Sequence, residues 1–172
     1  MGHGIFLHPD ADPVPKGRVI SAYAGEISIV PHDHADDSAY IFEMIAGMHL
    51  TKEEQKLLDK QLSYHPKRRY SLNLDALKKG NFTRFINHSE TPNVVAHLVR
   101  IPANDFGLET SPMQIVYFAK KTILPGEQLL VCYEDGEGTY WGALKVKPVP
   151  VTPRTFHLNG SLEIHSKAPS CV

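Results

Sequence analysis

Residues 80–93 read Gly-Asn-Phe-Thr-Arg-Phe-Ile-Asn-His-Ser-Glu-Thr-Pro-Asn (GNFTRFINHSETPN). Aromatic and polar residues mix here without a clear helical or strand period, which predicts irregular structure. By residue type alone the stretch suits a polar loop, because Asn, His, Ser and Pro all favour turns. A Ser-His hydrolase is a poor fit, since Ser89 follows His88 directly and no nucleophile-elbow glycine pattern surrounds it.

Three further segments lie on either side of this stretch. Residues 123–133 (ILPGEQLLVCY) predict a turn at Pro125-Gly126 and then a buried strand. Residues 16–27 (KGRVISAYAGEI) contain a short strand candidate, and residues 2–6 read GHGIF. The Gly-x-Gly at residues 2–4 is not a dinucleotide fingerprint, because no strand precedes it and no long helix follows.

Together and in this order, the four segments resemble the successive signature blocks of the SET-domain lysine methyltransferases. The likeness runs from Gly2 to about Trp141, and it is greatest to small SET proteins of viruses and bacteria that lack cysteine-rich flanks. The resemblance implies a mainly β fold with few helices, built of small curled, β-clip-like sheets. It also implies a C-terminal pseudoknot, a rare topology in which the Asn-His-Ser segment and the last strand thread past each other.

The resemblance further implies an enzyme that transfers a methyl group from S-adenosylmethionine to a lysine side chain of another protein. It assigns catalysis to Tyr133 and to Tyr23, the second tyrosine of a lysine channel. The residues that would bind the cofactor are His3, Gly4, Ile5, Tyr40, Arg84, Asn87, His88, Tyr140 and Trp141. Either of the last two could stack on the adenine, and a plain core role is the alternative for this pair.

Periodicity and turn residues predict the remaining elements. Strands are expected at residues 17–23, 40–44, 70–74, 113–119 and 128–133, and a helix is expected at Thr51–Tyr64. Thr51 and Glu54 match a capping box at the start of this helix. Leu57, Leu58 and Leu62 form an apolar stripe along it.

Residues 1–143 are expected to form the SET domain, with a variable insert at about 46–69 that helps to choose substrates. The composition changes in the tail, residues 144–172, where prolines cluster and Asn159-Gly160 predicts a hairpin. Because no cysteine-rich flank closes the channel, the tail is a candidate lid over the site or a candidate homodimer contact.

Composition narrows the class of protein. The 172 residues are 42% hydrophobic and 22% charged, with a formal net charge of −1. The net charge therefore does not indicate binding to DNA or RNA. Two distant cysteines exclude a disulfide framework. No apolar run reaches the ~20 residues of a membrane span, and the N-terminus carries no Sec-type signal. We expect a cytoplasmic or nuclear protein without direct nucleic-acid or membrane partners, and a secreted effector that acts in a host nucleus stays open.

Local charge bears on the substrate. Asp33, Asp36 and Asp37 form one acidic group, and Glu134, Asp135 and Glu137 form another beside Tyr133. They could attract a lysine-containing basic peptide such as a histone-like tail. The alternative is that both groups are solvated loops, and the sequence does not decide between the two.

Two other interpretations come from the residues. An aromatic channel could hold a methylated lysine by cation–π contact, so a catalytically weak module that binds lysine or methyl-lysine peptides is the second candidate function. His32-Asp33-His34 invites a metal interpretation, but an ordinary loop is preferred because a fourth ligand at recognisable spacing is missing. No metal is therefore expected.

Overall fold

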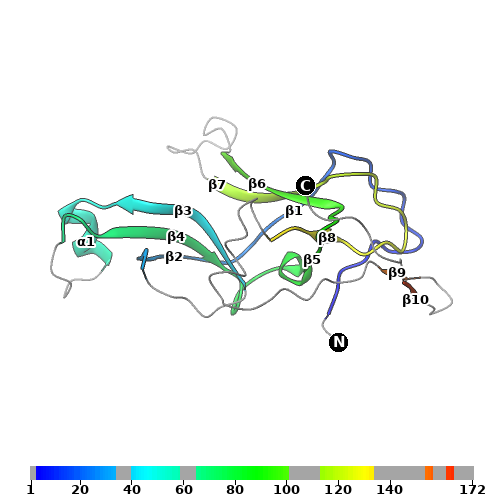
Figure 1. The fold of residues 1–172 in the computed structure, drawn as a ribbon, viewed down its shortest axis with the longest axis horizontal. Coiled ribbons are helices and arrows are strands. Elements are labelled where there is room, and N and C mark those ends of the chain that lie inside the picture. The colour runs from blue at the N-terminus through cyan, green and yellow to red at the C-terminus, as the bar shows by residue number, and fades with distance from the viewer. Residues whose placement is uncertain are drawn as a thin grey trace. The chain divides into compact units, whose positions relative to one another are not determined.

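The computed structural model describes residues 3–33, 40–58, 65–100, 113–133, 154–156 and 162–164. The chain divides into two compact units. Unit 1 comprises Met1–Ala22 and Phe85–Val172, and unit 2 comprises Tyr23–Arg84. Each unit contains a sheet of its own (Figure 1).

Unit 1 contains a five-stranded sheet of β1 (Val19–Ala22), β5 (Asn87–His88), β6 (Val94–Arg100), β7 (Met113–Ala119) and β8 (Leu130–Val131). The strand order is β1-β7-β6-β8-β5. Strand β7 is antiparallel to β1 and β6, whereas β8 is parallel to β5 and β6. Strand β7 has a partner on each side and is rich in β-branched and aromatic residues, which suit a buried strand. The core of this unit includes Ile86, Val94, Ile115, Tyr117, Ala119, Ile123, Leu129, Leu130 and Val131.

Strand β8 lies between two strands that are neighbours in the sequence. The segment Ser89–Asn93 connects β5 to β6, and it must cross β8 because β8 pairs with both strands. The N–H of Ser89 donates to the carbonyl of Val131 at 2.9 Å, and the N–H of Asn93 donates to the carbonyl of Leu130 at 3.1 Å. This threading is the pseudoknot that the resemblance implied.

The side chain of Asn93 secures the crossing. Its Nδ2 donates to the carbonyl of Gln128 and its Oδ1 accepts from the N–H of Leu130, both at 2.8 Å. The carboxamide is buried, with 3% of the residue exposed, so it takes the place of a neighbouring strand for this stretch of backbone. Strand β8 is therefore shorter than the predicted strand 128–133, because backbone groups of Gln128 and Leu130 bond the side chain of Asn93 and not a neighbouring strand.

Unit 2 contains a three-stranded antiparallel sheet of β2 (Glu26–Pro31), β3 (Ile41–His49) and β4 (Arg69–Asp75). The strand order is β2-β4-β3, so β4 is central and contributes four buried residues: Tyr70, Ser71, Asn73 and Leu74. The register of β3 shifts twice along β4, which indicates bulges. The predicted strands at 40–44 and 70–74 are confirmed, and β3 is longer than predicted. A 3-10 helix, η1 (Phe82–Phe85), replaces part of the irregular structure that was expected.

Helix α1 (Lys52–Leu58) lies in unit 2 and begins at the predicted capping box. The N–H of Thr51 donates to Oε2 of Glu54 at 2.7 Å, and the N–H of Glu54 donates to Oγ1 of Thr51 at 3.2 Å. Residues 59–64 of the predicted helix lie outside the described residues. No helix in the described ranges is long and apolar enough to cross a membrane.

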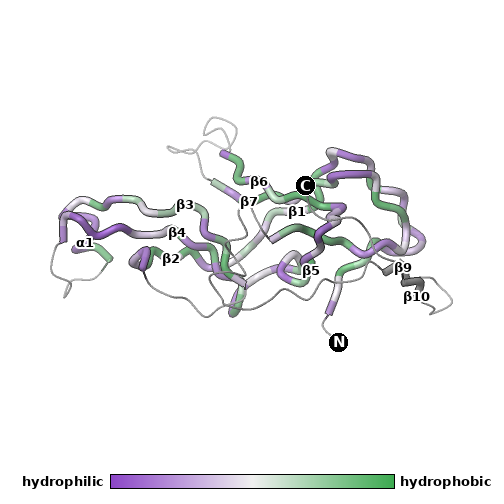
Figure 2. Tube along the Cα trace, in the orientation of Figure 1, coloured by the Kyte–Doolittle hydropathy of each residue, from purple (hydrophilic) through white to green (hydrophobic). Residues whose placement is uncertain are grey.

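The apolar stripe of α1 does not mark a buried face. Leu57 is 83% exposed and Leu58 is 43% exposed, whereas Gln55 is 1% exposed. The helix begins hydrophilic and ends hydrophobic (Figure 2). Gln55 is buried because its Nε2 donates to the carbonyls of Leu50 and His65, while its Oε1 accepts from the N–H of His65. The side chain thus bonds backbone on both sides of the helix.

In the tail, β9 (Arg154–Phe156) and β10 (Leu162–Ile164) pair antiparallel, as the predicted hairpin requires. Its Asn-Gly turn lies outside the described residues, and the roles of lid or dimer contact stay predictions. The mainly β fold with small sheets is confirmed.

Candidate functional site

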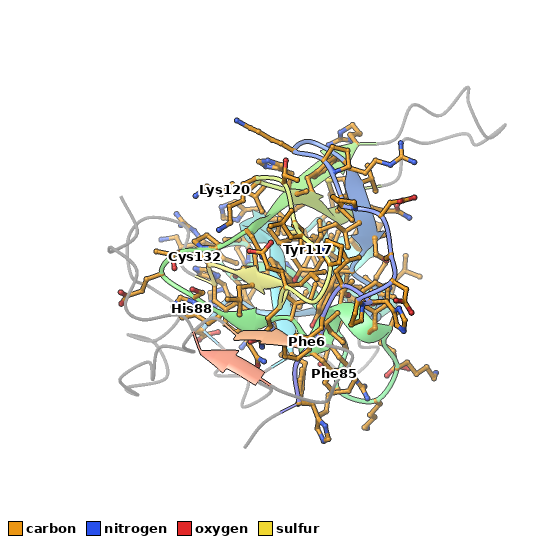
Figure 3. All side chains as sticks on the ribbon, turned by 90° about the vertical axis from the view of Figure 1, so that its right-hand side faces the viewer. Phe6, Phe85, His88, Tyr117, Lys120 and Cys132 are labelled. Atoms are coloured by element: carbon orange, nitrogen blue, oxygen red, sulfur yellow. The ribbon has the colours of Figure 1, made fainter. Side chains whose placement is uncertain are left out.

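Tyr133 follows β8 and is held by hydrogen bonds of both its side chain and its backbone. Its hydroxyl donates to the carbonyl of Ile86 at 2.6 Å, and its backbone N–H donates to Nδ1 of His88 at 3.1 Å. The rings of Tyr133 and His88 are tilted, with centroids 5.4 Å apart. In Figure 3, His88 and Cys132, the neighbour of Tyr133, lie on the same flank of unit 1. The pseudoknot is what brings residues 86–88 against residue 133.

These two hydrogen bonds determine where the protons of the Tyr133 hydroxyl and the His88 ring lie. The phenol of Tyr133 directs its proton at Ile86, and a phenol oxygen that donates its proton can also accept a hydrogen bond through its lone pairs. Because Nδ1 of His88 accepts, the proton of a neutral His88 ring lies on Nε2. The arrangement can orient an incoming N–H group but does not form a nucleophile–base pair.

The N-terminal segment His3–Ile5 lies against residues that lead into β5 and β8. Nδ2 of Asn87 donates to the carbonyl of His3 at 2.8 Å, and the N–H of Leu129 donates to the carbonyl of Ile5 at 2.8 Å. A Cβ on Gly4 would lie 2.6 Å from Nε2 of Gln128 and 3.3 Å from Nδ2 of Asn87. Glycine at this position therefore lets two carboxamides approach the backbone.

Aromatic residues adjoin this segment. The ring of His3 makes an edge contact with Phe85 at a centroid distance of 6.1 Å, and Phe6 pairs with Gln128 through an isolated bridge. Figure 3 shows Phe6 and Phe85 in the same corner of unit 1. Both were missed by sequence reasoning, because an aromatic residue in a loop carries no signal that separates a site from a core.

Three further predicted residues, Tyr23, Tyr40 and Arg84, lie in unit 2. The hydroxyl of Tyr23 donates to the carbonyl of Tyr40 at 2.7 Å, and its ring packs edge-on against Phe42 at 5.1 Å. The guanidinium of Arg84 lies 5.9 Å from the ring centre of Tyr40 and donates to the carbonyl of Ala76 at 2.8 Å. Tyr23, Tyr40 and Arg84 thus form one connected cluster within unit 2.

Gly25, two residues after Tyr23, lets the chain pass close to the end of β4. A Cβ at this position would lie 2.7 Å from the backbone carbonyl group of Asp75 and 3.1 Å from the backbone nitrogen of Ala76. Any larger residue would therefore collide with backbone, which cannot move aside as a flexible side chain can. Glycine allows β2 to begin beside the end of β4, where Glu26 pairs with Asp75.

Tyr140 and Trp141 lie outside the described residues, so their stacking role stays a prediction. In the His32-Asp33-His34 cluster, His34 also lies outside them, while Nδ1 of His32 is 2.8 Å from Oγ of Ser71 and 3.5 Å from Oε1 of Glu43. His32 thus has protein partners within the sheet of unit 2.

Sequence reasoning also missed the groups that hold the predicted residues in place. These are the carbonyl of Ile86, the carboxamide of Asn93 and the side chain of Gln128, which is 4% exposed. A backbone carbonyl has no sequence signal at all, since every residue has one. Asn93 was visible in the block at residues 80–93, but its partners, about 35 residues away, were not.

Comparison with known proteins places the chain among relatives. A family model described as SET domain matches residues 10–134, so His3–Ile5 precede the matched range. The chain is 28% identical over 134 residues to "Histone-lysine N-methyltransferase, H3 lysine-4 specific" of Schizosaccharomyces pombe. It is 32% identical over 122 residues to "Histone-lysine N-methyltransferase, H3 lysine-9 specific SUVH1" of Nicotiana tabacum.

These matches cover 78% and 71% of this chain but only 12% and 16% of the two relatives. The chain therefore spans a small part of the length of these curated relatives. Among solved structures, the methyltransferase domain of human PR domain-containing protein 2 matches with a TM-score of 0.45 and 21% identity. That match covers 78% of this chain and 70% of the other.

Proposed function

The chain belongs to the SET-domain family, and we propose that it transfers a methyl group from S-adenosylmethionine to the ε-amine of a lysine in another protein. The observation that carries the proposal is the fixed phenol of Tyr133, bonded to Ile86 and packed on His88 where the chain crosses itself. The names of the relatives support the reaction class, and the residues of unit 1 support its mechanism.

The methyl donor fits the groups around His3–Ile5. Its methionine part carries a carboxylate and an ammonium, and backbone groups with the carboxamide of Asn87 can contribute hydrogen bonds to both. When bound, the donor supplies a methyl group on a positively charged sulfur. Gly4 keeps this segment free of a side chain that would displace the two carboxamides.

The lysine has to be presented as a neutral amine. Its unperturbed pKa is about 10.4, so the neutral form costs about 4.6 kcal/mol at pH 7. Desolvation and a nearby positive charge both favour the neutral form. No dedicated general base is required, and the role of the Tyr133 oxygen is to accept an amine N–H and align the nitrogen for transfer.

The substrate that we propose is a basic protein segment, of the histone kind. The support is that relatives are named for lysines of histone H3. Tyr23, Tyr40 and Arg84 keep the roles in this reaction that the resemblance assigns to them, as part of the proposal.

Transfer from radiolabelled S-adenosylmethionine to a mixture of histones tests the proposal. We expect labelled lysine in the wild type and a loss of about 100-fold or more in kcat for Tyr133→Phe, because alignment of the amine is lost. Tyr70→Phe is the matched control. The hydroxyl of Tyr70 is buried without a hydrogen-bond partner in the described part of the chain, so its removal should leave kcat within about twofold.

Calorimetric binding of S-adenosylhomocysteine provides a readout that is independent of turnover. Wild type and Tyr133→Phe should bind it with similar affinity, since the phenol acts on the amine. Absence of donor binding, or full activity in Tyr133→Phe, would contradict the proposal. Binding of trimethyl-lysine peptides without any transfer would instead favour the catalytically weak module.

A further inference from the structure

Folding places four cations together that are about 100 positions apart in the sequence. Lys16 and Arg18 lie just before β1, and Lys120 and Lys121 follow β7. All four are exposed. We call these four residues the basic edge of unit 1. Lys120 is labelled in Figure 3, near the end of β7.

Backbone hydrogen bonds hold the two segments side by side. The N–H of Gly17 donates to the carbonyl of Ala119 at 2.8 Å, and the N–H of Ala119 donates to the carbonyl of Arg18 at 2.9 Å. Gly17 has φ of 83° and the N–H of Arg18 donates to the carbonyl of Pro15 at 3.1 Å. Lys16 therefore sits in a tight turn, directly before the glycine whose backbone conformation the turn requires.

Strand pairing on both sides of the turn keeps the cations close. Val14 bridges Ile123, and Val19 pairs with Phe118. Lys16 and Arg18 lie between Val14 and Val19, and Lys120 and Lys121 lie between Phe118 and Ile123. Like charges that are held close together repel each other.

No carboxylate neutralises the basic edge within the described residues. The ion pairs there are His8–Asp10, His32–Glu43 and Lys79–Glu26, and none of them includes a cation of the edge. A repulsive arrangement without a compensating acid is relieved when an anion binds.

We propose that the basic edge binds the phosphodiester backbone of a nucleic-acid duplex. A duplex of DNA carries one negative charge per about 1.7 Å of its axis, a charge density that complements a cluster of four cations. This inference differs from the expectation of no nucleic-acid partner, which rested on the net charge of −1 for the whole chain. It does not depend on methyl transfer.

The composition of the edge favours a phosphate backbone over an acidic protein. Protein interfaces place aromatic or large apolar anchors at their centre, and residues 15–18 and 119–122 contain none. Val19 and Leu124, each 55% exposed, lie singly just beyond the two segments, and single exposed apolar residues are ordinary. Recognition is therefore independent of base sequence.

Fluorescence anisotropy with 20-base-pair DNA and RNA duplexes tests the proposal across salt concentrations. We expect log K to fall with log salt with a slope of about −3 to −4, from up to four phosphate contacts. Lys120→Gln combined with Lys121→Gln should reduce that slope by about 2 and weaken binding at least tenfold at low salt. A preference for DNA or for RNA identifies the source of the phosphates and supports the proposal either way.

The matched control removes the same charge elsewhere. Lys67→Gln combined with Arg68→Gln, in unit 2, should leave affinity within about twofold, and thermal unfolding should confirm that both double variants are folded. Equal losses of duplex affinity in the two double variants would show that only the net charge of the protein matters, and this would overturn the proposal. So would unchanged binding in the first variant, or equally tight binding of poly-glutamate through the same two lysines.

Discussion

Asparagine and tyrosine side chains have different roles in the two units. In unit 1, the carboxamide of Asn93 makes two hydrogen bonds to backbone, and the hydroxyl of the half-buried Tyr133 donates to the carbonyl of Ile86. In unit 2, Oδ1 of Asn73 and the hydroxyl of Tyr70 have no hydrogen-bond partner in the part of the chain that the structure describes. Oε1 of Gln128, in unit 1, likewise has no hydrogen-bond partner among the described residues. Residue type therefore does not tell whether a buried polar group holds the fold together.

The difference is also one of sequence distance. The bonds that secure the crossing in unit 1 join residues 35 to 47 positions apart. Those that secure the α1 region of unit 2 join residues 3 to 10 positions apart. We expect mutations at the crossing to have larger effects than mutations around α1.

The largest effect on stability is expected at Asn93. Asn93→Ala leaves the carbonyl of Gln128 and the N–H of Leu130 buried without these partners, which should destabilise the protein by about 2–4 kcal/mol. Asn73→Ala, the matched control, removes an oxygen without a hydrogen-bond partner among the described residues and should change stability by less than about 1 kcal/mol. Urea unfolding measures both, and equal losses would contradict the comparison.

Around α1, a polar residue should matter more than an apolar one. Gln55→Ala removes three hydrogen bonds from a residue that is 1% exposed, and about 2 kcal/mol of stability should be lost. Leu57→Ala should change stability by no more than about 0.5 kcal/mol, because Leu57 is 83% exposed. Hydrogen exchange of the α1 amides would locate the effect. A larger loss for Leu57→Ala would restore the original interpretation of the stripe.

A smaller effect is expected at the cap of α1. Thr51→Ala removes the hydroxyl that accepts from the N–H of Glu54, and about 1 kcal/mol should be lost. Thr51→Ser keeps this acceptor and should stay close to wild type. Circular dichroism during urea unfolding distinguishes the two variants, and identical curves for them would show that the cap is unimportant.

The smallest effect is a pH dependence from Glu54. The backbone N–H of Thr51, and then its side chain, hold the pKa of Glu54 below the ordinary value of 4.5. A lowered pKa in the folded state stabilises the protein above pH 4.5, and the gain is lost as the pH falls through the lowered pKa. The advantage of wild type over Glu54→Gln should therefore shrink on acidification. An advantage that grows below pH 4 would have the wrong sign.

Much of the local structure could be predicted from the sequence. The strand at Met113–Ala119 has the bounds that its apolar run indicated, and Thr51 with Glu54 forms the expected cap. The turn at Pro125-Gly126 is present, with Gly126 at φ of 80°. Each depends on residues within a few positions of one another, whose preferences act before any tertiary contact forms.

The candidate site could be predicted only as a set of residues. The resemblance named Tyr133, His88 and Asn87, but not that Ile86 holds the phenol or that Asn87 holds His3. Arg84 was expected to bind the cofactor, and its contacts within unit 2 to Tyr40 and Ala76 carried no sequence signal.

The sequence by itself determined the family and the local elements, because motif residues and short-range preferences are written in consecutive positions. Only the tertiary structure decided which backbone carbonyl receives the Tyr133 proton, why Gln55 and not Leu57 is buried, and that residues 17–18 lie beside Ala119. Such pairings join distant positions through groups that every residue carries. They are therefore fixed by strand order and register, which no single stretch of sequence contains.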